Sequence, residues 1–249
     1  MIRTVIFDID DTLYNYKEGN IAGIAAVTAY LEQHFGLKPA YSEAAITAAQ
    51  RKQEARIGSA TAAIHDRLIR YQILLENENL PILPHARVMN DLYWETLLSV
   101  MKTEPGVIEL IEALIAAGIR IGIGTNMTGH IQYEKLERLG LSDYIDFLVI
   151  SEETGAEKPE PRFFEVLKEK AQAEPSECVF IGDSLRKDAQ AAAREGMHGV
   201  WYTAKEAASA PGVGVIRDFR DCLTPDGIRL GGQRIGDGSS TVEGRFFTR

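Results

Sequence analysis

The spacing of apolar residues changes from strand-like to helix-like soon after the chain begins. Val5, Ile6 and Phe7 form an uninterrupted apolar run, which is typical of a central parallel strand covered by helices on both faces. From Glu18 to Met101, apolar residues recur at three- and four-residue intervals, and this spacing indicates helices only. Four helices are expected, at about 21–36, 42–57 with Ser42 as its N-cap, 59–76 (or 61–76), and 85–100.

After Gly106 the pattern alternates between amphipathic helices and short apolar strands, which indicates a doubly wound sheet. We therefore predict an α/β protein with a doubly wound, Rossmann-like parallel sheet and an inserted all-helical domain. The predicted core comprises residues 1–14 and 104–223, the insertion residues 15–103, and a glycine-rich C-terminal tail residues 224–249. Strands are expected at 119–124, 146–150, 178–182 and 199–202, and helices at 107–117, 128–139, 161–171 and 186–194.

The tail has a different pattern from the rest of the chain. Gly231-Gly232 and Asp237-Gly238 are turn signals, and residues 241–247 could form a short edge strand. We hypothesise that the tail docks on its own domain or on a neighbouring subunit through Phe246 and Phe247. A homo-oligomer is therefore left open.

Composition and charge exclude several classes of partner. The 249 residues are 45% hydrophobic and 25% charged, as in an ordinary globular protein. The net charge of −9, with no basic stripe, argues against nucleic acid as a ligand. Cys178 and Cys222 are too few for a disulfide framework and are expected to be reduced thiols. No apolar leader or membrane-length stretch is found, so we expect a soluble, cytoplasmic protein without a membrane partner.

Acidic residues follow the first strand directly. Asp8, Asp10 and Asp11 occupy three of four consecutive positions. In open parallel sheets, ligands bind outside the carboxyl ends of the strands, so these acids stand where a site would form. A hard divalent cation such as Mg²⁺ would offset their repulsion, because it prefers carboxylate and carbonyl oxygens. The alternative for such acids is a solvated turn without a ligand.

Further polar residues follow the later strands in a recognisable order. The set comprises Asp8-x-Asp10-x-Thr12, then Thr125, then Lys158 within Gly155-Ala156-Glu157-Lys158-Pro159, and finally Gly182-Asp183-Ser184-x-x-x-Asp188. Together these motifs resemble those of the haloacid dehalogenase superfamily of aspartate-nucleophile hydrolases. The resemblance covers about residues 1–205, and the helical insertion is similar to the cap domain of that superfamily.

The resemblance implies a magnesium-dependent hydrolase of small phosphomonoesters, such as nucleoside monophosphates or sugar phosphates. Asp8 would be the nucleophile that forms an aspartyl-phosphate, and Asp10 would protonate the leaving group and later activate water. The phosphoryl group would be bound by Thr125, by the backbone amide of Asn126 and by Lys158. Mg²⁺ would be held by Asp8, by the backbone carbonyl of Asp10 and by Asp183, with Asp188 binding through water or orienting Lys158.

Several alternatives remain at this stage. A phosphomutase shares Asp8 and Asp10, and a non-catalytic binding protein or a signalling receiver domain has a similar acidic pocket. A receiver lacks such a long insertion, and a dehalogenase would replace Asp10 because halide needs no proton donor. In the cap, Tyr93 and Trp94 could stack on a base or form the cap core. Four cap arginines could pair with an anionic substrate, or could be solvated or salt-bridged: Arg51, Arg56, Arg67 and Arg70.

Overall fold

The computed structural model describes residues 1–206 and 208–235, and its centre is a six-stranded parallel sheet in the order β3-β2-β1-β4-β5-β6. Within this sheet Ile6 of β1 lies between Gly122 and Phe180 of the neighbouring strands. The predicted α/β fold is confirmed, with a sixth strand that the sequence pattern did not indicate. The strands are β1 (Thr4–Phe7), β2 (Arg120–Thr125), β3 (Phe147–Ile150), β4 (Cys178–Gly182), β5 (His198–Tyr202) and β6 (Gly214–Ile216).

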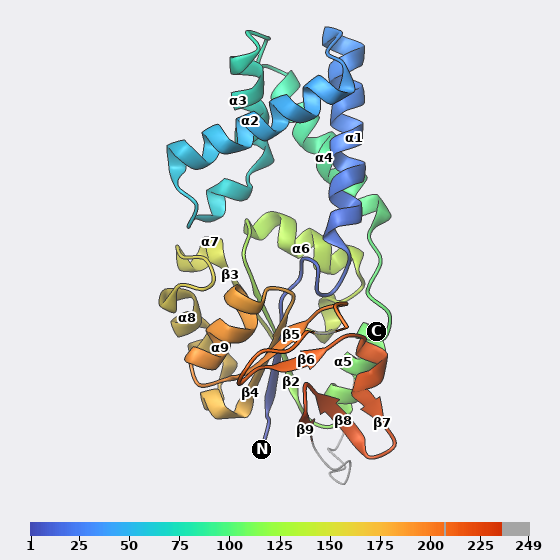
Figure 1. The fold of residues 1–249 in the computed structure, drawn as a ribbon, viewed down its shortest axis with the longest axis vertical. Coiled ribbons are helices and arrows are strands. Elements are labelled where there is room, and N and C mark those ends of the chain that lie inside the picture. The colour runs from blue at the N-terminus through green and yellow to red at the C-terminus, as the bar shows by residue number, and fades with distance from the viewer. Residues whose placement is uncertain (207, 236–249) are drawn as a thin grey trace.

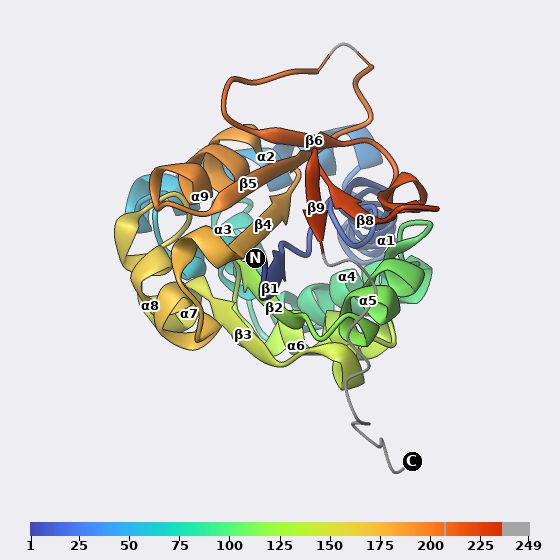
Figure 2. The same cartoon turned by 90° about the horizontal axis from the view of Figure 1, so that it is seen from below.

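Helices cover both faces of this sheet (Figure 2). Val5 and Phe7 of β1 belong to the core cluster that includes residues of α5 (Val107–Ala116) and α6 (Gly129–Arg138). Ile6 points to the other face, where it belongs to a cluster with residues of α8 (Pro161–Ala171) and α9 (Gln190–Arg194). Alternate side chains of β1 are therefore buried on opposite faces, as its continuous apolar run predicts. One short helix, α7 (Ser151–Thr154), directly follows β3.

A helical insertion separates β1 from α5 and lies beyond one end of the sheet (Figure 1). Its two connections to the sheet domain are paired with each other, because the Glu104 amide donates to the Leu13 carbonyl at 2.8 Å. Among the helices of the described residues, none combines the length and apolar character that a membrane span requires. The insertion contains α1 (Tyr16–Phe35), α2 (Pro39–Ile57), the 3₁₀ turn η1 (Ala62–His65), α3 (Arg67–Asn77) and α4 (His85–Val100).

The predicted helix starts at Ser42 and at residue 59 are wrong, and α1 begins at Tyr16, earlier than the expected start near residue 21. Ser42 is not an N-cap, because α2 already begins at Pro39, whose fixed φ suits the first helical position. The single helix expected at 59–76 is instead divided at Asp66. The Asp66 carboxylate accepts hydrogen bonds from the amides of Leu68 at 2.8 Å and Ile69 at 3.3 Å. This side-chain cap satisfies free amides of α3 and so starts a new helix at Arg67.

The described part of the C-terminal tail forms a second, antiparallel sheet. Its strands are β7 (Leu223–Thr224), β8 (Gly227–Leu230) and β9 (Gln233–Ile235), and β7 spans the predicted boundary between core and tail. The predicted turn at Gly231-Gly232 joins β8 to β9, and both glycines have positive φ. The buried side chains of this sheet join the main core. Three further predictions for the tail lie outside the described residues: the turn at Asp237-Gly238, the strand at 241–247 and the contacts of Phe246 and Phe247.

Gly199 in β5 allows a close approach of backbone from the next layer. A Cβ atom at this position would lie 1.9 Å from the carbonyl oxygen of Ala189. We therefore expect Gly199→Ala to lower the free energy of unfolding by about 1–3 kcal/mol, because backbone must move to accept the methyl group. Urea denaturation measures this loss. Gly129→Ala is the matched control, since its nearest neighbour is the flexible Glu152 side chain at 3.3 Å, and an equal loss in both variants would contradict the argument.

Candidate active site

The carboxyl ends of β1 and β4 are tied together by backbone and side-chain hydrogen bonds. Asp8 directly follows β1, and Asp183 directly follows β4. The hydroxyl of Thr12 accepts a hydrogen bond from the Asp183 amide at 3.0 Å, and the Trp201 indole donates to the Asp183 carbonyl at 2.8 Å. Thr12 thus connects the turn after β1 to the end of β4, and the two carboxylates are brought to the same edge of the sheet.

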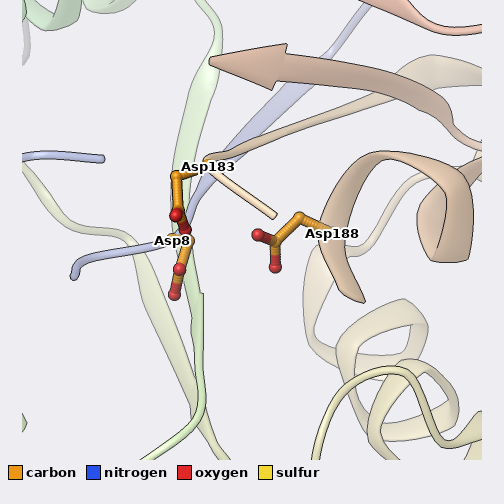
Figure 3. A group of neighbouring side chains, drawn as sticks. All are labelled: Asp8, Asp183 and Asp188. Carbon is orange, nitrogen blue, oxygen red and sulfur yellow. The ribbon is translucent and has the colours of Figure 1, made fainter. Parts of the chain in front are cut away.

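Three carboxylates meet at this edge and form what we call the acidic cluster: Asp8, Asp183 and Asp188 (Figure 3). One oxygen of each lies within 4.8 Å of the others. Asp188 comes from a π-helical turn, η4 (Leu185–Ala189), and its carboxylate accepts from the Ser184 amide at 2.9 Å. Gly182 makes room for it, because a Cβ there would lie 2.4 Å from the Asp188 carboxyl carbon.

Lys158 is the cation nearest to the acidic cluster. Its ammonium group lies 2.9 Å from Asp8 Oδ1 and 2.7 Å from Asp188 Oδ1, and it also donates to the Gly124 carbonyl at 2.8 Å. Burial would lower the pKa of Lys158, but the Asp188 and Asp8 carboxylates raise it above its usual range. Asn126 holds the lysine loop, since its side chain accepts from the Lys158 amide at 2.8 Å. Lys158 is therefore a fixed, fully charged group.

The acidic cluster carries more negative charge than Lys158 offsets. Burial, opposed by the charge of Lys158, raises the pKa of Asp8 to about 6. Burial and the charges of Asp8 and Asp188 raise the pKa of Asp183 to about 7. Carboxylates that offer only hard oxygen donors and crowd together beside Lys158 fit the requirements of a Mg²⁺ site, because a divalent cation would offset their repulsion.

Asp10 lies apart from this cluster in a network of its own. Its Oδ1 accepts from the ammonium of Lys135 at 2.6 Å and from the hydroxyl of Tyr14 at 2.5 Å, and its Oδ2 accepts from Gln132 at 3.2 Å. Burial would raise the pKa of Asp10, but the Lys135 charge and these hydrogen bonds lower it below its usual value. Two aspartates that are two residues apart are thus held by two different lysines.

The residues at the carboxyl end of β2 connect the acidic cluster with the Asp10 network. Thr125 is buried, and its hydroxyl accepts a hydrogen bond from Gln132 at 2.6 Å. Gln132 therefore contacts both Thr125 and Asp10. The side chain of Asn126 also donates to Glu157 at 3.3 Å, which places it on the Lys158 side of the site. All seven residues that the sequence singled out thus lie at this end of the sheet.

A pocket of about 310 Å³ opens above the acidic cluster, and we call it the Asp8 pocket. It is also lined by Asp10, Asn126 and Lys158. A larger cavity of about 800 Å³ is lined mostly by the helical insertion, with Glu157 and Lys187 of the sheet domain at its wall, and we call it the insertion cavity. Tyr16, His65 and Lys187 line both spaces, so the two adjoin. A molecule bound over Asp8 would therefore extend towards the insertion.

The sequence analysis missed Lys135, Gln132 and Tyr14, which hold Asp10. A signal for two of them was present, because Gln132 and Lys135 occur beside Ile131 and Leu136 on the apolar face of a helix. A lysine on such a face is seldom fully buried unless it is paired. The pattern could therefore have indicated that Lys135 is a buried charge. It could not have identified Asp10 as the partner, because Asp10 is distant in the sequence.

The chain is similar to known proteins over most of its length. The chain matches the model of the haloacid dehalogenase-like hydrolases over residues 2–196. It is 36% identical to a ribulose-1,5-bisphosphate 5-phosphatase of Halopiger xanaduensis, over 84% of this chain and 88% of that protein. It is 35% identical to a glyceraldehyde 3-phosphate phosphatase of Methanopyrus kandleri, over 79% of this chain and 82% of that protein. A solved structure, 2-haloacid dehalogenase from Pseudomonas syringae pv. Tomato DC3000, matches with a TM-score of 0.69 and 25% identity, over 88% and 95% of the two chains.

Proposed function

The chain belongs to the haloacid dehalogenase-like hydrolases and is a phosphatase of that family, and from this premise we propose that it hydrolyses small sugar phosphates through an aspartyl-phosphate on Asp8. The observation that carries the proposal is the separate support of two carboxylates. Asp8 lies beside Lys158, and Asp10 lies beside Lys135. A site that only bound a cation would not need a second aspartate held away from the acidic cluster.

Asp8 is the group that attacks phosphorus. Lys158 at 2.9 Å favours its ionised form and offers a positive charge to the incoming phosphoryl group. Attack forms a bond from the Asp8 carboxylate to phosphorus and releases the substrate's alkoxide. Thr125 and the backbone amide of Asn126 donate hydrogen bonds to the phosphoryl oxygens, because Thr125 ends the neighbouring strand β2 and Asn126 follows it at the same edge of the sheet.

Asp10 moves the protons of both halves of the reaction. It donates one to the leaving alkoxide and takes one from the water that attacks the aspartyl-phosphate. Beside Lys135 it is ionised, which is the form required in the second half. The negative charge of an arriving phosphate raises the pKa of Asp10, and this favours the protonated form required in the first half.

The acidic cluster is the proposed magnesium site. Mg²⁺ would be held by the carboxylates of Asp8 and Asp183 and by the backbone carbonyl of Asp10. Asp188 would bind it through water or, in keeping with its 2.7 Å contact, orient Lys158. Bound Mg²⁺ supplies positive charge that offsets the repulsion between the nucleophile and the phosphate. Residues 15–103 are the proposed cap, whose cavity adjoins the Asp8 pocket and encloses the substrate's remaining part.

The sugar-phosphate assignment is supported by two relatives that are named for phosphorylated sugars. Dehalogenation, the activity named for one structural neighbour, is disfavoured by Asp10, because halide leaves without a proton. A phosphomutase remains the alternative within the family, since it uses the same two aspartates. Phosphate release separates these activities. We expect free phosphate from ribulose 1,5-bisphosphate or glyceraldehyde 3-phosphate, whereas an isomeric sugar phosphate without phosphate release would indicate a mutase.

Removal of divalent cations should abolish activity. With EDTA present, we expect no hydrolysis of p-nitrophenyl phosphate, because the uncompensated acidic cluster repels the substrate. Added Mg²⁺ should restore activity, Zn²⁺ should substitute poorly, and Ca²⁺ should inhibit because its looser shell misplaces the nucleophile. Mg²⁺ should also raise the melting temperature of the wild-type protein.

Asp183→Asn provides the control for this experiment. It removes one carboxylate from the acidic cluster, so the Mg²⁺-dependent rise in melting temperature should be smaller or lost. Undiminished turnover in EDTA by the wild-type protein would refute the magnesium proposal, whatever the variant does.

A further inference from the structure

The insertion cavity contains two buried arginines. Arg67 and Arg70 lie one turn apart on α3, are 5% and 7% exposed, and line the same space of about 800 Å³. The sequence analysis left these side chains open between solvent, salt bridges and an anionic substrate. Their burial excludes solvent, so the nature of their partners decides their role.

Every hydrogen-bond partner of Arg67 is neutral. Its guanidinium donates to the hydroxyls of Tyr16 at 2.6 Å and Tyr93 at 3.3 Å, and to the His65 carbonyl at 2.9 Å. The guanidinium carbon lies 5.0 Å from the centre of the Tyr93 ring. Within residues 1–206 and 208–235, its Nε has no hydrogen-bond partner. Among the described residues, no carboxylate lies within 4.0 Å of this positive charge.

Arg70 likewise lacks a carboxylate partner among the described residues. It donates to the side chain of Gln53 at 3.2 Å and to the Ile64 carbonyl at 3.0 Å, and in the described part of the chain it has no ion pair. Burial and the neighbouring charge of Arg67 lower the pKa of Arg70 to about 10. Two like charges are therefore buried side by side without a counter-charge from the described part of the chain.

The acids that line the insertion cavity do not supply that counter-charge. Glu157 is engaged by His65 at 2.7 Å, Glu54 accepts from Gln50 at 3.1 Å, and Glu43 is exposed. An unpaired buried charge costs several kcal/mol, and proteins normally pair it or bind an ion there. Guanidinium groups match phosphate oxygens especially well, because their planar donors can bind two oxygens at once.

We infer that Arg67 and Arg70 bind a second phosphate group of the substrate, so that the enzyme acts on bisphosphorylated small molecules. The inference rests on the proposed function, in which the first phosphate lies over Asp8. Tyr16 and His65 line both spaces, and Tyr16 also accepts a hydrogen bond from Arg67. One molecule can therefore have a phosphate at each end, with its carbon chain passing these two side chains.

The test compares two substrates that differ only in the second phosphate, ribulose 1,5-bisphosphate and ribulose 5-phosphate. For the wild-type protein, we expect kcat/KM to be at least about 10-fold higher for the bisphosphate. Arg67→Gln should lower kcat/KM for the bisphosphate by about 10- to 100-fold, mainly through KM, and should affect the monophosphate less. Arg67→Lys, which retains the charge, should retain part of the preference.

Arg51→Gln is the matched control, because Arg51 is exposed on α2 and does not line the insertion cavity. It should leave the ratio of the two kcat/KM values unchanged. Equal efficiency of the wild-type protein with both substrates would overturn the inference, and this measurement does not depend on the folding of any variant. An equal loss on both substrates in Arg67→Gln would overturn it too. Failure of the wild-type protein to hydrolyse even p-nitrophenyl phosphate would instead refute the proposed function, and the inference with it.

Discussion

Asp8→Asn is expected to reduce the hydrolysis of p-nitrophenyl phosphate by about 10⁵-fold or more, because no other group takes over the role of a deleted nucleophile. The amide has the shape of the carboxylate and can still accept a hydrogen bond from Lys158, which lies 2.9 Å from Asp8 Oδ1. The loss should therefore appear in kcat rather than in folding. Phosphate release at saturating substrate and Mg²⁺ measures it.

The stability of this variant should move in the opposite direction to its activity. The pKa of Asp8 in the folded protein is raised to about 6. A raised carboxyl pKa means that the ionised group destabilises the fold above the pKa of the unfolded chain, near 4. At pH 8 and without Mg²⁺, the neutral amide removes this cost, so the melting temperature should stay equal or rise. Asp143→Asn, on an exposed residue, should change neither activity nor melting temperature, and normal turnover by Asp8→Asn would eliminate the aspartyl-phosphate mechanism.

Asp10→Asn is expected to divide the reaction into its two halves. The variant keeps the nucleophile and loses the proton donor and the later base, each of which contributes about 10²–10⁴-fold. A sugar phosphate, with its poor alkoxide leaving group, should hardly react. Acetyl phosphate or p-nitrophenyl phosphate needs little protonation, so it should still phosphorylate Asp8. A hydroxylamine-sensitive acyl phosphate should then accumulate and appear as a mass gain on the peptide that contains Asp8.

The Asp10 network requires a control for folding. Lys135 is fully buried and paired with Asp10 at 2.6 Å, so Asp10→Asn leaves a buried charge unpaired. Breaking such a pair typically costs about 3–5 kcal/mol. The double variant Asp10→Asn/Lys135→Met removes both charges, and it should recover much of the melting temperature without recovering sugar-phosphate turnover.

Two outcomes would count against this assignment of roles. Recovery of activity in the double variant would show that Asp10→Asn acts only through stability. A phosphoryl label on a residue other than Asp8 would show that the nucleophile is misassigned. Accumulation of the acyl phosphate in both variants is the result that the two-lysine arrangement predicts.

The local pattern of the sequence was sufficient for most helices and for the central sheet. The apolar run before Asp8 determined a strand buried on both faces, and helix ends at glycines such as Gly36 and Gly140 followed from their freedom to adopt positive φ. Motif order placed the acids of the candidate site at strand ends, because parallel strands present their carboxyl ends at one edge. Local rules failed at Asp66, where a side-chain cap divided an otherwise continuous helical pattern.

The shorter strands escaped prediction because they have little local signal. The three residues of β6 acquire their strand conformation from pairing with β5. The strands β8 and β9 are likewise defined by their register with each other and by burial of residues such as Leu230 in the main core. A short segment rich in glycine has weak strand propensity, so its neighbours decide its conformation.

The sequence by itself determined the α/β core, the position of the helical insertion and the identity of the residues at the strand ends. Only the tertiary structure decided which charged side chains form ion pairs with each other. It paired Lys158 with Asp8 and Asp188, paired Lys135 with Asp10, and left Arg67 without a carboxylate among the described residues. Propensity and periodicity act over a few residues, whereas the partner of a buried charge is set by packing between segments that are distant in the sequence. Lys135 and Asp10, for example, are 125 positions apart.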